Sequence, residues 1–179
     1  MRLLRRPVVW VAVVVLVFSA GIGLYWFQPW KLVTDREVDE RLAIPPASVA
    51  PVSVAPVKPS GPAVERQGEF ISHEHETTGV ARVITRPDGS RLLELVGLDT
   101  SNGPDLRVWL SDQPVRSGVD GWRVFDDGKW IELGRLKGNR GDQAYQIPAG
   151  TNLDQLASVA IWCKRFAVSF GAAGLTPPA

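Results

Sequence analysis

A single thiol is the side chain of this sequence best suited to redox chemistry. Cys163 is the only cysteine among 179 residues, so it has no partner for an intramolecular disulfide. It lies in residues 158–170, whose alternation gives the strongest strand signal of the chain. An uninterrupted strand places Trp162 and Phe166 on an aromatic core face, and Cys163 on a more polar face beside Arg165. Because a nearby cation favours the thiolate, which binds metals and does redox chemistry, we predict a redox role for Cys163.

Two other interpretations of Cys163 stay open. A cysteine often packs in a protein core as a small hydrophobic residue, and a β-bulge within residues 158–170 would turn the thiol back to the core. An exposed lone thiol would instead form an intermolecular disulfide. The exposure of the sulfur distinguishes a core residue from a reactive one.

The two histidines of the chain form a candidate metal site. His73 and His75 stand two residues apart, and in an extended segment over residues 70–75 both imidazoles project from one face. Together with Cys163 they make a His₂Cys set, which is typical of blue-copper centres. The only methionine is Met1 in the N-terminal tail, so the usual axial ligand is missing. Solvated surface histidines are the alternative.

Known catalytic motifs are absent from the sequence. It contains no G-x-S-x-G, H-E-x-x-H, P-loop or C-x-x-C motif, and the lack of C-x-x-C-H excludes covalent attachment of c-type haem. Residues 99–105 resemble a calcium loop, but Pro104 occupies the position of the EF-hand glycine and the distal glutamate is missing. We expect Asp99 and Asp105 to bind local backbone amides in a turn. The chain is therefore not predicted to be a stand-alone enzyme.

The N-terminal segment has the properties of a transmembrane helix. Residues 8–27 contain no charge and would span about 30 Å as a helix, which matches the hydrocarbon core of a bilayer. The arginines Arg2, Arg5 and Arg6 precede this segment. They predict a cytoplasmic N-terminus and an extracytoplasmic C-terminal domain.

A cleaved signal peptide is the alternative for this segment. Ser19 and Ala20 are small, but Phe18 lies where a cleavage site requires a small side chain, and the apolar run continues beyond it. We therefore predict an uncleaved signal anchor in a cell membrane.

The rest of the chain divides by composition. A cytoplasmic tail over residues 1–7 precedes the anchor, and a tail over 176–179 ends the chain. Residues 28–44 form a juxtamembrane segment in which Thr34 has the spacing of a capping box, so we expect a short helix. Residues 45–67 are rich in Pro, Ala, Val and Ser, which predicts a polyproline II linker able to hold the domain about 70 Å from the membrane.

Residues 68–175 have the pattern of an all-β domain. Short alternating segments are separated by turn signals. Strands are expected at 80–86, 91–96, 106–110, 130–133, 143–147 and 158–170, with one helical turn at 152–157. This spacing indicates a small β-sandwich or a Greek-key barrel. The net charge of +1 and the lack of a basic block argue against a nucleic-acid partner.

Several motifs carry a family resemblance. They are the run WCKRFAVSFG at 162–171, Gly103-Pro104-Asp105, His75 with Gly79, the run GRLKGN at 134–139 with Gly141, and Tyr145 with Ile147 and Pro148. Together they resemble the DM-thirteen domain family over about residues 68–175. The glycine-rich run is similar to a bacterial, membrane-anchored branch of that family.

The resemblance implies a role in electron transfer. The characteristic cysteine of the family, here Cys163, is proposed to act as a bare thiol or as a ligand of a prosthetic group such as haem. His75 matches a histidine of the family and is a second candidate ligand for haem or a metal, whereas His73 does not match. Relatives in animals and plants carry a DOMON domain, so the resemblance implies a separate redox partner here. The alternative function is a non-catalytic cell-surface binding or adhesion module in which Cys163 is structural.

Overall fold

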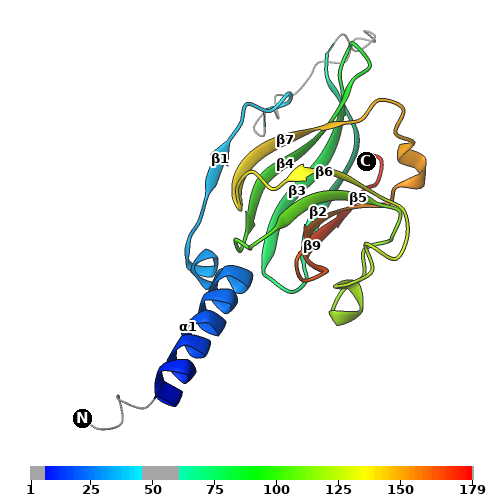
Figure 1. Cartoon of the computed structure of the whole chain (residues 1–179). Coiled ribbons are helices and arrows are strands. Elements are labelled where there is room, and N and C mark those ends of the chain that lie inside the picture. Colours follow the sequence, from blue (N-terminus) through cyan, green and yellow to red (C-terminus); the bar gives the residue numbers. More distant parts are fainter. Residues whose placement is uncertain (1–6, 46–60, 179) are drawn as a thin grey trace.

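An apolar helix leads into a β-rich domain. The computed structural model describes residues 7–45 and 61–178. Helix α1 (Pro7–Phe27) extends away from the domain, and none of its residues is buried (Figure 1). A helix satisfies its backbone hydrogen bonds internally, as a bilayer requires. The predicted apolar helix is therefore confirmed, and its length and composition suit a signal anchor or a signal peptide.

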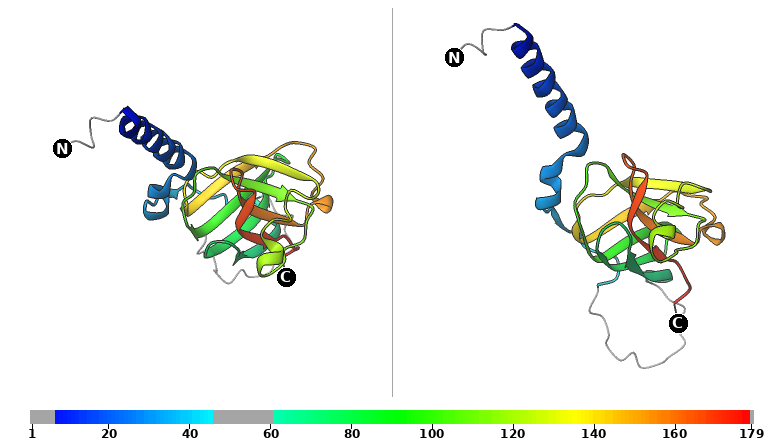
Figure 2. Two further views of the ribbon diagram at one scale, coloured as in Figure 1. Left: turned by 60° about the horizontal axis from the view of Figure 1, so that its bottom comes forward. Right: turned by 90° about the horizontal axis from the view of Figure 1, so that it is seen from below.

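Nine strands form one curled sheet shaped like half a barrel (Figures 1 and 2). They are β1 (Glu37–Asp39), β2 (Ala63–Ser72), β3 (Thr77–Thr85), β4 (Arg91–Thr100), β5 (Leu106–Ser111), β6 (Trp130–Arg135), β7 (Arg140–Ile147), β8 (Ser158–Cys163) and β9 (Val168–Gly174). Short 3₁₀ helices lie at η2 (Pro29–Val33), η3 (Val119–Gly121) and η4 (Leu153–Gln155). The strand order is β1-β7-β4-β3-β2-β9-β8-β5-β6, and only the pair β1–β7 is parallel.

The long strand β2 joins the two halves of the sheet. Its first part pairs with β3, and its last three residues, Phe70 to Ser72, pair with β9. An all-β domain was the expectation, and the domain is mostly β. The expected sandwich or Greek-key barrel is not formed, because β2 is shared by both halves and makes them one continuous sheet.

Two hydrophobic clusters lie on opposite faces of β5, β8 and β9. The larger cluster takes residues from both halves of the sheet, so the curl encloses it. The smaller cluster packs Trp109 and Trp162 against Phe125, which comes from the long connection between β5 and β6. Alternate residues of one strand thus serve different clusters.

The juxtamembrane segment is part of the sheet. The short helix expected after the capping box at Thr34 is not formed, because η2 ends at Val33 and β1 follows as a strand. Strand β1 can approach β7 because Gly138 and Gly141 have no side chains; a Cβ on Gly141 would collide with the backbone oxygen of Val38. Pairing with β7 outweighs the local capping signal.

The Pro-rich segment begins and ends on the same domain. Of the predicted linker over 45–67, residues 46–60 lie outside the described residues. Before them, Arg82 Nη2 donates to the backbone oxygen of Ile44. After them, β2 begins at Ala63, which pairs with Thr85. The sheet thus extends beyond the predicted domain start at residue 68, and the described residues give no support to a spacer between α1 and the domain.

Candidate functional site

Cys163 ends strand β8 and begins a tight turn into β9. The backbone amide of Phe166 donates to the oxygen of Cys163 at 3.2 Å, and Ala167 follows with a left-handed φ of 49°. Cys163 and Val168 are then opposite each other across the hairpin. The expected single strand over 158–170 is therefore wrong. The turn over residues 164–167 contains neither glycine nor proline, so the alternation of the sequence gave no sign of it.

The thiol faces the core. A register shift between Ile161 and Trp162 accompanies the hairpin, and Cys163 packs in the larger cluster with Val168 and Phe170. Trp162 belongs to the smaller cluster on the other face. Cys163 has 0% exposure, so the predicted polar face is wrong. An intermolecular disulfide is likewise contradicted in this form of the protein, and core packing is the interpretation that the burial supports.

Burial controls the acidity of Cys163. Loss of water around the sulfur raises the pKa of the thiol above its ordinary value of 9.0. Three backbone amides, those of Phe166, Arg165 and Asp105, oppose this by stabilising the thiolate, but burial outweighs them. The thiol is therefore protonated at neutral pH, although its surroundings offer several donors to a negatively charged sulfur.

Arg165 binds the end of helix α1 rather than the sulfur of Cys163. Its Nη1 donates to the backbone oxygens of Tyr25 (3.1 Å) and Trp26 (2.6 Å), and the guanidinium lies over both rings, 5.8 Å and 5.4 Å from their centroids. The last carbonyls of a helix lack internal partners, so a cation there is stabilising. Phe166 beside it stacks on Phe27 with ring centroids 5.7 Å apart. The turn after Cys163 thus docks onto the helix.

His75 lies in a pocket between the helix end and the domain. Its ring packs on Phe170 with centroids 3.9 Å apart. Burial lowers the pKa of His75 from its ordinary value of 6.5, and the nearby Glu74 only partly offsets this. The imidazole is therefore neutral at neutral pH and can accept a proton.

His73 has a different environment. It is buried, Nδ1 lies 2.9 Å from Ser169 Oγ, and Nε2 lies 3.1 Å from the backbone oxygen of Arg116. Its ring packs on Phe125, beside the smaller cluster. Strand β2 ends at Ser72, so the predicted extended segment over residues 70–75 is interrupted and the two histidines have separate partners.

The Gly103-Pro104-Asp105 segment lies between two pockets. Asn102 Oδ1 accepts a hydrogen bond from the amide of Gly103 at 2.8 Å, while Asp105 forms an ion pair with Arg107 at 2.8 Å. The expected binding of Asp99 and Asp105 to local amides is wrong for these side chains, because both pair with arginines. A Cβ on Gly103 would lie 2.9 Å from the ring of Phe170, so the glycine permits close packing against the wall of the His75 pocket.

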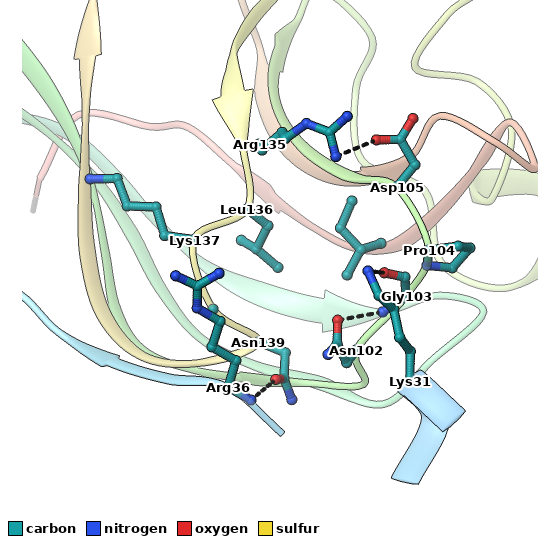
Figure 3. Close-up of a pocket in the computed structure, with 12 residues that line it drawn as sticks. Lys31, Arg36, Asn102, Gly103, Pro104, Asp105, Arg135, Leu136, Lys137 and Asn139 are labelled. Atoms are coloured by element: carbon teal, nitrogen blue, oxygen red, sulfur yellow. Dashed lines mark hydrogen bonds and ion pairs between the residues drawn. The ribbon is translucent and has the colours of Figure 1, made fainter. Parts of the chain in front are cut away.

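The first of these pockets is apolar. It has a volume of about 220 Å³, and we call it the apolar pocket. Its lining includes Phe27, Pro29, Leu32, His75, Phe166 and Phe170. Cys163 is not part of this lining. The second pocket, on the other side of residues 102–105, is rich in cations (Figure 3).

The described residues do not fit a haem or a bound metal. Cys163 has no exposed surface to offer an iron, and the apolar pocket is smaller than the roughly 300–1,000 Å³ of sites for drug-sized ligands. Haem is larger than such ligands. Within residues 7–45 and 61–178, no group of three or more His, Cys, Asp or Glu side chains is placed to hold a metal ion. His73, His75 and Cys163 are thus not gathered into one ligand set.

Several residues of the site were missed at the level of sequence. Phe27 ends the predicted transmembrane helix and Lys31 lies in the predicted juxtamembrane segment, yet both residues line the pockets. Asn139 is buried and its Oδ1 accepts from the amide of Arg36 at 2.7 Å, which fixes this segment on the domain. The Gly138-Asn139 pair was the available signal, because a glycine that permits close approach beside a buried amide marks a docking position.

Comparison with known proteins identifies a family for the domain. A family model described as "Electron transfer DM13" matches residues 69–175, which is more than half of the chain. No curated protein matches the chain. No solved structure matches it either.

Proposed function

Because the chain belongs to the electron-transfer DM13 family, we propose that it is a membrane-anchored, extracytoplasmic domain that transfers electrons through Cys163. The charge-free helix α1 would be an uncleaved anchor, with the N-terminal arginines in the cytoplasm. The docking of Arg165 on the carbonyls of Tyr25 and Trp26 supports retention of the helix, since it gives the helix end a structural role.

One observation carries the redox role. Cys163 is the single cysteine of the chain, and three backbone amides favour its thiolate form even though burial keeps it protonated. Such donors stabilise the thiolate that forms when the proton leaves the sulfur. The sulfur exchanges electrons with a separate partner protein, and the proposal requires no cofactor held by the chain itself.

The step balances with one electron and one proton. The thiol S–H bond is broken, the electron passes to a separate oxidised one-electron carrier protein, and a thiyl sulfur remains. The proton passes to solvent water when the structure opens at Cys163. Reduction by the carrier in its reduced form reverses both transfers.

The full-length chain in uncharged detergent provides the test. Ferricyanide serves as the one-electron oxidant, and its bleaching is followed in the wild type and in Cys163→Ala. We expect about one equivalent per chain to be consumed in the wild type, recovery of the thiol with ascorbate, and no consumption in the variant. Equal consumption in both proteins, or none in either, would contradict the proposal.

A second candidate is a binding module with a structural cysteine. The complete burial of Cys163 and its raised pKa favour it, because both are typical of a cysteine that acts as a small core residue. In this case Cys163→Ala lowers the free energy of unfolding by on the order of 1 kcal/mol through lost packing. Electron exchange is then absent from the wild type as well, which separates the two candidates.

A further inference from the structure

A pocket with unmatched positive charge lies on the other side of residues 102–105 from the apolar pocket. We call it the basic pocket; it has a volume of about 470 Å³. Three segments form it: the chain after α1, the loop over 102–106, and the β6–β7 connection over 135–139 (Figure 3). Both the G-P-D and the G-N motifs of the sequence therefore lie in its wall, and neither is used in the electron-transfer proposal.

Four cations and one carboxylate line the basic pocket. The cations are Lys31, Arg36, Arg135 and Lys137, and the carboxylate is Asp105. Asp105 is already paired with Arg107 at 2.8 Å, and its contact with Arg135 is longer, at 3.5 Å. The pocket therefore has excess positive charge.

The cations differ in how far they are neutralised. Lys137 is bound to Glu40 at 2.8 Å and to the oxygen of Ala144, so its charge is largely matched. Lys31 Nζ donates to the backbone oxygen of Gly103 at 3.1 Å, and this neutral partner leaves the charge in place. The guanidinium of Arg36 has no hydrogen bond or ion pair within the part of the chain that the structure describes.

The position of Arg36 is fixed by buried groups. Asn139 is 1% exposed, its Oδ1 accepts from the Arg36 amide at 2.7 Å, and its Nδ2 donates to the oxygen of Thr100 at 2.8 Å. From this anchored backbone the Arg36 side chain extends towards Leu136, into the pocket (Figure 3). A free guanidinium on a rigid support is preorganised for an anion with several oxygens.

We propose that the basic pocket binds a phosphate group, with Arg36, Lys31 and Arg135 as its ligands. Cations that approach from separate segments suit a tetrahedral oxyanion, and the volume leaves room for the rest of a phosphate ester. Lys31 follows the end of the apolar helix α1 by a few residues, so a phospholipid headgroup is one source of the phosphate and a soluble phosphate is the other. This site is independent of the electron-transfer proposal.

Calorimetry on the full-length chain in uncharged detergent tests this proposal. The probes are inorganic phosphate, dihexanoyl phosphatidylglycerol and, as a zwitterionic control, dihexanoyl phosphatidylcholine. The variant Arg36→Gln removes the free guanidinium, and Arg86→Gln removes one exposed cation of the β3–β4 turn outside the pocket. A charged hydrogen bond contributes enough that Arg36→Gln should weaken binding about tenfold, with little change in Arg86→Gln.

The outcomes separate the two sources. Tighter binding of phosphatidylglycerol than of phosphate assigns a lipid headgroup, and equal binding of both assigns a soluble phosphate. The proposal is overturned if neither anion binds, if phosphatidylcholine binds as well as phosphatidylglycerol, or if Arg36→Gln and Arg86→Gln lose affinity equally. Arg135→Gln is a second variant for the pocket, and its 71% exposed side chain makes a folding defect easy to exclude by circular dichroism.

Discussion

Residues 102–105 separate two regions of opposite character. On one side lie the apolar pocket and, in the core, the fully buried Cys163; on the other side lies the charged basic pocket. In the first region burial keeps the Cys163 thiol and the His75 imidazole neutral, whereas the second region presents an unpaired guanidinium, that of Arg36. A reagent can therefore reach Cys163 only when the structure opens. A ligand of the basic pocket needs only to diffuse into it.

On the enclosed side, removal of the Phe170 ring should cause the largest loss of stability. Phe170 is 3% exposed, packs in the cluster that contains Cys163 and forms a wall of the apolar pocket. We expect Phe170→Ala to lower the free energy of unfolding by about 3–5 kcal/mol and to speed native-state labelling of the thiol. Urea denaturation and reaction with a disulfide reagent measure the two effects. Phe27→Ala is the control, since Phe27 lines the same pocket but is 61% exposed, and an equal loss there would contradict the assignment.

A smaller effect concerns the charge of His75. Burial lowers its pKa from 6.5, so the folded state prefers the neutral ring. The stability from this preference is complete above pH about 6.5 and is lost as the pH falls through 6.5 towards the lowered pKa. His75→Asn should reduce the fall in melting temperature between pH about 7 and pH about 5. Part of the fall remains, because the pKa of His73 is also lowered by burial. An unchanged pH profile in the variant would count against a half-buried, neutral imidazole at His75.

The turn that follows Cys163 contains one residue with a strained backbone, Ala167. Ala167 has a φ of 49°, a conformation that costs an L-residue with a Cβ roughly 1–2 kcal/mol. Ala167→Gly should therefore raise the free energy of unfolding by about 0.5–1 kcal/mol, after the greater entropy of glycine in the unfolded chain is subtracted. Thermal denaturation provides the measurement. Ala63→Gly in β2, where φ is not positive, should destabilise instead, and stabilisation by both changes would refute the argument from strain.

On the charged side, removal of the Glu40 carboxylate that pairs with Lys137 should strengthen phosphate binding. A hydrogen bond from Lys137 lowers the pKa of Glu40 below 4.5, so the two groups neutralise each other at neutral pH. Glu40→Gln leaves an additional free ammonium beside the basic pocket, and we expect phosphate to bind about two- to fivefold more tightly. Calorimetry with inorganic phosphate measures this change. Glu69→Gln in β2 removes the same charge outside the pocket and serves as the control. An equal gain in phosphate affinity in this variant would show that only the net charge of the protein matters.

Much of the strand pattern could be predicted from the sequence. Strands β3 to β7 lie where alternation and turn residues indicated them, because a half-buried strand has an apolar residue at every second position. The position of Cys163 could not be predicted, since the turn at 164–167 has no glycine or proline and its residues continue the strand alternation. Strand β8 keeps its alternation, so Cys163 lies on the same face as Val159 and Ile161, and that face is buried because the sheet curls around it.

The role of the juxtamembrane segment could not be predicted from the sequence either. Thr34 begins a local helix signal, but Gly138 and Gly141, about a hundred residues later, admit this segment as strand β1. Local propensity is a weak guide where a distant part of the chain supplies the partner. For the same reason Arg36 was not predicted as a site residue, because its importance depends on its anchoring by Asn139.

Strand β1 also covers one edge of the sheet. It covers β7, which would otherwise be an open edge of the sheet, and the residues after it place Ala43 and Ile44 on the pair Glu94 and Arg82. An uncovered edge strand is a template for pairing with another copy. A fragment beginning at β2, as the family boundaries suggest, would expose both the β7 edge and a buried carboxylate. Residues 35–45 therefore cover the β7 edge and the Glu94 carboxylate, and we expect a fragment without them to associate more readily than the full chain.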